Sequence, residues 1–246
     1  MILITGPTGS GKTTTLYATL EKINSERQKI ITVEDPVEYQ LEGITQIQAN
    51  ASIGLNFATG LRSIVRQDPD VLMVGEIRDH ETAEIAIESA LTGHLVFSTL
   101  HTNDAASAVT RLQDMGVEGY LISSSLLAIQ AQRLVRRVCS HCAETRPLNE
   151  DEATVLEINA NTCPEIRRGK GCERCGQTGY RGRGGLYELL MMSDAIRHHI
   201  ASGADANIIR DEAKKEGMRT LREDAIDKLN AGLTTPEEIA RVTRAI

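Results

Sequence analysis

The first 135 residues alternate between short apolar runs and longer amphipathic stretches. Four runs rich in aliphatic and β-branched side chains are typical of buried strands, and they span residues 2–5, 29–33, 71–74 and 95–100. A further segment, residues 44–49, alternates in polarity as a half-exposed strand does. Helical spacing of apolar positions predicts helices over residues 13–23, 56–67, 81–92, 105–116 and 121–135. Strands and helices alternating in this way predict an α/β fold with a mostly parallel sheet covered on both faces.

The pattern changes at Cys139. From there to about residue 185 the chain is rich in Cys, Gly, Arg and Pro and has little helical or strand periodicity, and beyond it the chain turns helical again. We therefore expect three parts: a core over residues 1–138, a cysteine-rich module over 139–185, and a helical region over 186–246.

Composition narrows the class of protein. The 246 residues are 41% hydrophobic and 25% charged, which is ordinary for a globular protein. A net charge of −7 and only 3% aromatic residues, with no Trp, argue against a general nucleic-acid binder. No apolar run approaches the ~20 residues of a membrane span and no signal peptide is evident, so we expect a cytoplasmic protein. Because the first strand begins at Ile2 without a lead-in, we also expect a fragment whose upstream domains are missing.

A glycine-rich loop lies between the first predicted strand and the first predicted helix. Its sequence GPTGSGKT fits the pattern G-x-x-x-x-G-K-[ST] in the context that confirms the motif; an ordinary glycine turn is the alternative. The glycines let backbone N–H groups face phosphate oxygens, Lys12 reaches the β- and γ-phosphates, and the Thr13 hydroxyl can ligate Mg²⁺. The predicted nucleoside-triphosphate site comprises Gly6, Pro7, Thr8, Gly9, Ser10, Gly11, Lys12, Thr13 and Thr14.

Two acidic clusters directly follow buried strands. The first holds Glu34, Asp35 and Glu38, and the second holds Glu76 and Asp79. An enzyme with such a loop needs one acid for the water shell of its metal and another to orient the attacking water. Both clusters fall at carboxyl ends of parallel strands, where ligands bind in open α/β sheets. We place Glu76 at the metal-side (Walker B) position and Glu34 as the water-polarising base, with Glu38 as a further catalytic candidate; solvated turn carboxylates are the alternative.

Four cysteines form two C-x2-C pairs with 29 residues between them, Cys139 with Cys142 and Cys172 with Cys175. Four thiolates favour tetrahedral Zn²⁺, and a site without an open position is structural. Such a staple suits a loop-rich segment without its own core. Disulfides are disfavoured in a cytosolic chain, and Cys163 is interpreted as a plain thiol. A nucleic-acid zinc ribbon stays open because of nearby cations, namely Arg167, Arg168, Lys170, Arg174, Arg181 and Arg183.

Taken together, these motifs resemble those of a known family. GPTGSGKT, ITVEDPVEY, RQDPDVLMVGEIRD, TGHLVFSTLHTNDA and the cysteine pairs occur in the order found in secretion ATPases, and the branch most similar is that of type II secretion and type IV pilus assembly ATPases. The resemblance covers essentially the whole chain. It implies a RecA-like P-loop fold with a small zinc module, ATP hydrolysis, and a working form that is a hexameric ring.

The resemblance also gives candidate roles to two histidines and two arginines. His94 and His101 flank the fourth apolar run; His101 is similar to the family's γ-phosphate sensor, with His94 as its support. Arg62 and Arg66 lie four residues apart and share a face of one predicted helix. By resemblance they reach the nucleotide of a neighbouring subunit and neutralise charge on its γ-phosphate. Satisfied structural histidines and a solvated arginine face are the alternatives.

The implied function is that of a mechanochemical ATPase that drives assembly of a pilin-like filament. The implied partners are further copies in a homo-hexamer, an inner-membrane platform protein, and the cytoplasmic domain of a secretion or pilus assembly protein, with no nucleic acid. The protein would lie peripheral to the bacterial inner membrane and use ATP, Mg²⁺ and Zn²⁺. The alternatives are a nucleic-acid translocase for DNA uptake or transfer on the same core, and a scaffold that binds ATP without turnover. The motifs do not separate secretion from pilus extension.

Overall fold

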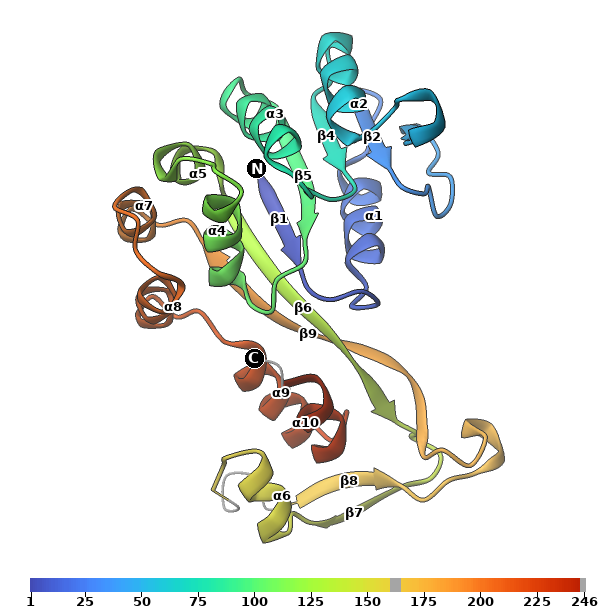
Figure 1. Cartoon of the computed structure of the whole chain (residues 1–246). Helices are drawn as coiled ribbons and strands as arrows, with labels where there is room; N and C mark the ends of the chain where they lie inside the picture. Colours follow the sequence, from blue (N-terminus) through green and yellow to red (C-terminus); the bar gives the residue numbers. More distant parts are fainter. Residues whose placement is uncertain (160–164, 244–246) are drawn as a thin grey trace. The chain divides into compact units, whose positions relative to one another are not determined.

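A computed structural model describes residues 1–159 and 165–243 of the chain (Figure 1). The chain divides into two compact units, unit 1 with residues Met1–Ala131 and Leu189–Met218, and unit 2 with residues Gln132–Glu188 and Arg219–Ile246. Each unit is thus built from segments that are far apart in the sequence.

The main sheet is formed by the strands β1 Ile2–Thr5, β2 Ile30–Glu34, β3 Thr45–Gln48, β4 Val71–Val74, β5 Leu95–Leu100, β6 Ala128–Val138 and β9 Tyr180–Met191. Among the described residues their order is β3-β2-β4-β5-β1-β6-β9. The pairs β2–β3, β2–β4, β4–β5, β5–β1 and β1–β6 are parallel (Figure 1). The four apolar runs of the sequence therefore form neighbouring strands of one mostly parallel sheet, as predicted.

Helices follow the strands of unit 1 in the predicted alternation. They are α1 Lys12–Ile23, α2 Phe57–Ile64, α3 His80–Leu91, α4 Ala105–Asp114, α5 Gly119–Ser125, α7 Asp194–Ala201 and α8 Ala206–Lys215, with 3-10 turns η1 Ala51–Ile53 and η2 Val65–Gln67. Side-chain caps fix where two of them begin: Asp79 accepts the N–H of Thr82 at the start of α3, and Asp104 accepts that of Ser107 at the start of α4, each at 2.8 Å. Such a cap typically stabilises a helix by about 1 kcal/mol.

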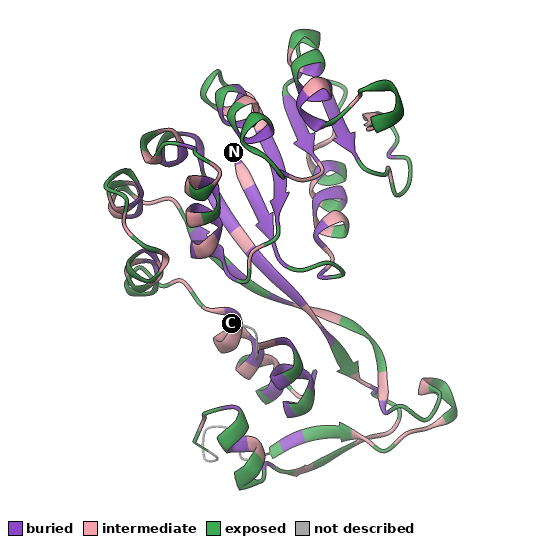
Figure 2. Cartoon of the chain, in the orientation of Figure 1, coloured by how far each residue is buried: buried purple, intermediate pink, exposed green. Residues whose placement is uncertain are grey.

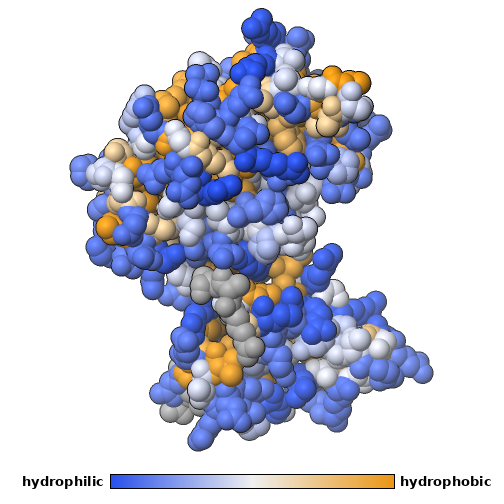
Figure 3. Space-filling view, in the orientation of Figure 1, coloured by the Kyte–Doolittle hydropathy of each residue, from blue (hydrophilic) through white to orange (hydrophobic). Residues whose placement is uncertain are grey.

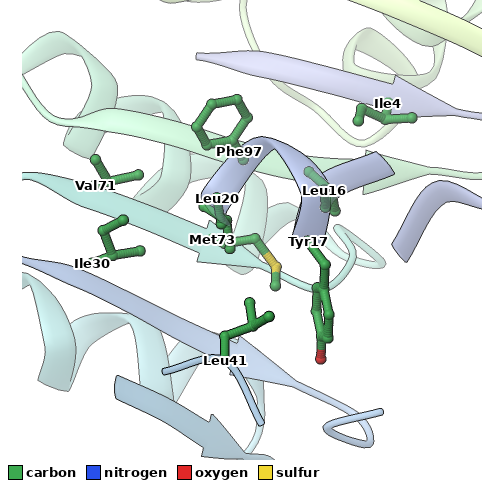
Figure 4. Close-up of a cluster of buried hydrophobic side chains, with 9 residues drawn as sticks. All are labelled: Ile4, Leu16, Tyr17, Leu20, Ile30, Leu41, Val71, Met73 and Phe97. Carbon is green, nitrogen blue, oxygen red and sulfur yellow. The ribbon is translucent and has the colours of Figure 1, made fainter. Parts of the chain in front are cut away.

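One core cluster of unit 1 lies between α1 and the sheet (Figure 4). Leu16, Tyr17 and Leu20 project from α1 and are fully buried. They pack with side chains from the strands and the following loop, namely Ile4, Ile30, Leu41, Val71, Met73 and Phe97. Figure 2 shows β1, β2, β4 and β5 buried along most of their length. Burying each such side chain stabilises the fold by roughly 1.5–3 kcal/mol, so this layer anchors the helix that begins at Lys12.

The helix predicted over residues 121–135 is wrong in its second half. Helix α5 ends at Ser125, the backbone of Leu126 is extended, and strand β6 begins at Ala128. Residues Ala128–Ala131 of β6 pair in parallel with β1. The apolar spacing suited either structure, and pairing with a buried central strand decides in favour of the strand.

Unit 2 contains more regular structure than its sequence suggested. Its elements are β7 Ala143–Pro147, α6 Glu150–Val155, β8 Glu165–Gly169, the 3-10 turn η4 Glu173–Cys175, α9 Leu221–Asn230 and α10 Pro236–Thr243. The antiparallel pair β7–β8 was not predicted because half of the residues in its strands, AETRP and EIRRG, are charged. The helices were expected from about residue 186, but β9 continues to Met191 and the next helix begins at Asp194.

A buried carboxylate stabilises α10 of unit 2. Glu238 is 1% exposed and accepts hydrogen bonds from the backbone N–H of Arg136 at 2.8 Å and from the guanidinium of Arg241 at 2.9 Å. The Arg136 guanidinium lies 2.8 Å away as well. Burial acts to raise the pKa of Glu238, but hydrogen bonds from the two arginines outweigh it and lower the pKa to about 2.

The face of the molecule in Figure 3 is largely hydrophilic, with scattered hydrophobic patches. Within the described part of the chain, no helix combines the length and hydropathy needed to cross a bilayer.

Candidate functional site

Four neighbouring strands of unit 1 end at one edge of the sheet with residues that the sequence singled out. The order β2-β4-β5-β1 places these strands side by side, and all three pairs are parallel. Glu34 ends β2, Glu76 follows β4, His101 follows β5, and the glycine-rich loop follows β1. Because carboxyl ends of parallel strands share an edge, the fold brings these residues to the place where ligands bind in open α/β sheets.

The glycine-rich loop wraps back on itself before α1 begins. Gly9 and Gly11 have φ angles of 78° and 87°, in the left-handed region that favours glycine. The ammonium group of Lys12 donates to the carbonyls of Gly6 at 2.7 Å and Pro7 at 3.3 Å, so it already lies across the loop. Of the other predicted phosphate-binding residues, Ser10 is buried, Thr13 is half-buried, and Thr8 and Thr14 are exposed.

Glu76 and His101 contact each other across neighbouring strand ends. Nε2 of His101 lies 3.3 Å from Oε2 of Glu76, whose side chain is 18% exposed. Arg78, which the sequence analysis missed, pairs with the other oxygen of Glu76 and lies 3.7 Å from Asp35. The hydrogen bond to Glu76 raises the pKa of the Arg78 guanidinium. The only sequence signal for Arg78 was its place two residues after Glu76 in the run GEIRD.

Two threonines join the loop after β5 to the end of β1. The hydroxyl oxygens of Thr5 and Thr102 lie 2.6 Å apart, and the backbone N–H of Thr102 donates to the Thr5 hydroxyl at 2.9 Å. Thr5 also donates to the carbonyl of Leu100 at 3.1 Å. These bonds fix the backbone on either side of His101 against the strand that leads into the glycine-rich loop.

The structure places Glu34 and Glu38 differently. Glu34 is 3% exposed, and its carboxylate accepts hydrogen bonds from Tyr17, Thr32 and Gln46. The side chain of Glu38 is exposed, and its backbone N–H donates to the Tyr17 hydroxyl at 3.2 Å. In the described residues no hydrogen bond joins Glu34 to Glu76 or His101, so the two predicted acids occupy separate environments at one sheet edge.

The two predicted arginines have different surroundings. Arg62 pairs with Glu81 at 2.5 Å, whereas Arg66 is exposed and forms no ion pair among the described residues. Arg62 lies in α2 and Arg66 in η2, so the helix ends between them.

His94 was expected to support His101, and this is wrong. Nδ1 of His94 lies 2.9 Å from the carbonyl of Ser89 at the carboxyl end of α3. His94 precedes β5 and His101 follows it, and a six-residue strand separates its ends by roughly 20 Å. Two imidazoles at opposite ends of a strand cannot touch.

The four cysteines of unit 2 come together as the spacing predicted. All four Sγ atoms lie within 4.8 Å of one another. The pairs Cys139–Cys172 and Cys142–Cys175 are each 3.9 Å apart, and Cys172–Cys175 is 3.7 Å. A tetrahedron with Zn–S bonds of about 2.3 Å has S···S edges of about 3.8 Å, so the cluster fits Zn²⁺. Disulfides, with S–S of about 2.05 Å, do not match these separations. Cys163 lies outside the described residues.

Backbone donors at the cluster favour the thiolate of Cys175, whereas burial raises the pKa of the Cys142 thiol to about 12. The N–H groups of Cys172 and Gly179 donate to Sγ of Cys175 at 3.2 and 3.3 Å. Burial acts to raise the pKa of the Cys175 thiol, but these donors outweigh it and lower the pKa to about 6.

Gly169 and Gly179 approach so closely that a Cβ on Gly169 would lie 2.1 Å from the Gly179 carbonyl oxygen. His141 contacts Arg174 at 2.9 Å and is not part of the ligand cluster found in the described residues.

The chain is similar to proteins of known family. A family model described as "Type II/IV secretion system protein" matches residues 1–241. The chain is 54% identical to "Type II secretion system protein E" of Aeromonas hydrophila, over 99% of this chain and 48% of that protein. It is 52% identical to "Type IV pilus assembly ATPase PilB" of Thermus thermophilus, over 97% of this chain and 27% of that protein. The solved structure of the pilus retraction motor PilT with bound ADP matches with a TM-score of 0.71 at 31% identity, covering 98% of this chain and 60% of that one. The chain spans about half or less of the length of these curated relatives.

Proposed function

The chain belongs to the family of type II/IV secretion system proteins, and from this membership we propose that it is the ATP-hydrolysing part of a hexameric motor. The motor powers assembly of a pilin-like filament, for type II secretion or for type IV pilus extension. Relatives named for both settings support this breadth, because the chain is 54% identical to one and 52% identical to the other.

The observation that carries the proposal is the contact of Glu76 with His101 beside the glycine-rich loop. Nε2 of His101 and Oε2 of Glu76 are 3.3 Å apart, and β5, which precedes His101, pairs with both β1 and β4. A group that senses the γ-phosphate must lie between the phosphate loop and the acid on the metal side. The strand order supports this position for His101.

The residues of this edge divide the work of hydrolysis. Lys12 would exchange its carbonyl partners for β- and γ-phosphate oxygens, and the Thr13 hydroxyl and Glu76 would hold Mg²⁺ and its water shell. Mg²⁺, when bound, neutralises charge on the β- and γ-oxygens. His101 donates to the γ-phosphate, and Glu34 orients the attacking water, with Glu38 as the less buried alternative. The donor set of the loop, a lysine, a hydroxyl and backbone N–H groups, fits a nucleotide with a hard divalent cation.

Arginines from one subunit complete the site of the next. Arg66 supports this role best because it is exposed and forms no ion pair within the described residues, whereas Arg62 must first leave Glu81. Hydrolysis then depends on the position of the neighbour, which couples chemistry to the shape of the ring.

The proposal also gives a role to each of the three regions of the chain. Residues 1–138 form the ATPase core, residues 139–185 form a module held by Zn²⁺ on Cys139, Cys142, Cys172 and Cys175, and the helices of the region 186–246, the first of which begins at Asp194, are packing elements. The protein works on the cytoplasmic face of the inner membrane, where it meets a platform protein and the cytoplasmic domain of an assembly protein.

ATPase activity of a version extended to the length of the relatives tests the proposal. Turnover is expected to rise with a cytoplasmic fragment of the platform protein, to ignore single-stranded DNA, and to vanish in Lys12→Ala. Stimulation by DNA alone would identify a nucleic-acid translocase instead. ATP binding without turnover would identify a scaffold.

A further inference from the structure

The hydrogen bonds around Glu34 restrict both oxygens of its carboxylate. Oε1 accepts from the Thr32 hydroxyl at 2.5 Å and from the Gln46 amide at 3.1 Å, and Oε2 accepts from the Tyr17 hydroxyl. A carboxylate offers about four lone-pair sites. Three donors therefore leave about one direction free for a further partner, such as a water molecule.

Strand geometry explains why these donors converge. Thr32 and Glu34 are two residues apart in β2, so their side chains lie on the same face of the strand. Gln46 of β3 pairs directly with Thr32 in the parallel register. The Gln46 side chain is itself held, because its Oε1 accepts the backbone N–H of Leu41 at 2.7 Å. Two of the three donors are thus fixed by sheet pairing.

Tyr17 brings the third donor from α1, the helix that follows the glycine-rich loop. Its hydroxyl donates to Glu34 and accepts from the backbone N–H of Glu38 at 3.2 Å and from the Gln46 amide at 3.3 Å. Burial, and then the hydrogen bond to Glu34, raise the pKa of Tyr17 above its ordinary value, so the phenol stays protonated and keeps donating.

The ring of Tyr17 has little freedom to move. It is fully buried in the core cluster, with its oxygen projecting away from the aliphatic side chains (Figure 4). The ring of Tyr39 packs edge-on against it with centroids 4.7 Å apart. A rigid ring that ends in a fully bonded hydroxyl holds its acceptor in one orientation.

We propose that Tyr17 and Gln46 are positioning residues for ATP hydrolysis, which act by aiming the remaining lone pair of Glu34 at the attacking water. This inference rests on the proposed function, in which Glu34 is the base. It adds that one helix, α1, positions both the catalytic base and Lys12, because Tyr17 lies five residues after Lys12 in α1. A small misplacement of a reacting group is costly in rate.

Steady-state kinetics of the extended protein test the inference. Tyr17→Phe deletes one donor to Glu34 and is expected to lower kcat about tenfold, with KM for ATP and affinity for a non-hydrolysable analogue unchanged. Gln46→Met is expected to act in the same direction. Tyr39→Phe is the matched control, because it deletes a hydroxyl from the ring beside Tyr17 and none of the donors to Glu34. Its kcat should equal that of the wild type.

A double variant separates positioning from a purely structural role. Tyr17→Phe should cause no further loss of kcat in a Glu34→Gln background, because the group it acts through is already gone. A wild-type or raised kcat in Tyr17→Phe overturns the inference, and so does a loss that persists beside Glu34→Gln. In both cases the wild type still hydrolyses ATP and the proposed function stands. A wild type that does not hydrolyse ATP overturns both proposals.

Discussion

The two candidate sites of this chain are assembled by different physical means. At the sheet edge of unit 1, Glu76 and His101 follow strands whose side chains are almost entirely buried, and the two side chains contact each other at 3.3 Å. At the cysteine cluster of unit 2, four thiols approach within 4.8 Å beside two short strands, half of whose residues are charged. In the first region the fold makes the site, whereas we propose that in the second a bound metal stabilises the fold. Disrupting the site of unit 1 should therefore abolish activity and leave the fold intact, whereas removing the metal from unit 2 should disrupt its fold.

Removal of the metal from unit 2 should produce the largest effect. Structural zinc contributes about 10–16 kcal/mol of binding free energy, which is comparable to the whole stability of a typical domain. Cys142→Ser, or a chelator, should take zinc from about one per chain to none and expose residues 139–179 to limited proteolysis. Metal analysis and mapped cleavage sites measure this. Cys163→Ser is the control that should keep its zinc, and full zinc occupancy in Cys142→Ser would break the comparison.

Loss of Lys12 should abolish function without unfolding unit 1. Lys12→Ala removes the charge that contacts the carbonyls of Gly6 and Pro7 and that we propose binds the phosphates. Hydrolysis should fall by at least about 10²-fold, while the melting temperature changes little because the core layer is intact. Lys22→Ala, an exposed change on the same helix, is the control. A cooperative loss of structure in Lys12→Ala would show that this site, too, holds its fold.

The two ends of β5 offer a sharper contrast within unit 1. His101→Ala should lower kcat by about 10- to 100-fold, because it removes the partner of Glu76 beside the phosphates. His94→Ala, at the other end, should leave kcat unchanged and only reduce stability, because it loses the contact with Ser89 at the end of α3. Parallel measurements of ATP turnover and thermal melting separate the two, and equal kinetic losses would contradict the assignment.

A pH series on Glu238 should show an effect on stability alone. Its pKa of about 2 in the folded chain lies below the ordinary value of 4.5, so the charged form stabilises the fold above about pH 4.5 and this contribution disappears as the pH falls to about 2. Glu238→Gln should cost roughly 1.5–3 kcal/mol at neutral pH and much less near pH 2. Thermal melts across this range measure the difference, and a constant gap would exclude the ionic contribution.

The sequence predicted the parallel sheet well because buried central strands carry uninterrupted apolar runs. It failed where two structures share one pattern: residues 128–135 have spacing suited to a helix, but they lie in β6, which pairs with β1 over Ala128–Ala131 and also neighbours β9. It also missed β7 and β8, whose charged residues give no apolar alternation. Tertiary pairing supplies information that local periodicity lacks.

The candidate sites divide in the same way. Glycine spacing predicted the left-handed turn before α1, and cysteine spacing predicted that the four thiols come together, because each motif is a short pattern local in sequence. Arg78 and Tyr17 were missed because their significance lies in their partners, Glu76 and Glu34, which only the folded strand order brings near. The role predicted for His94 was wrong for the converse reason. His94 and His101 are close in sequence, but they lie at opposite ends of an extended strand and are therefore distant in space.

The hydroxyl contacts between Thr5 and Thr102 have a mechanical consequence. The hydroxyl oxygens are 2.6 Å apart, and the N–H···O hydrogen bond has a donor–acceptor distance of 2.9 Å. These contacts tie the segment that carries His101 to the segment that enters the glycine-rich loop. The two segments should therefore move together. A displacement of one segment either shifts the other or breaks a hydrogen bond between Thr5 and Thr102.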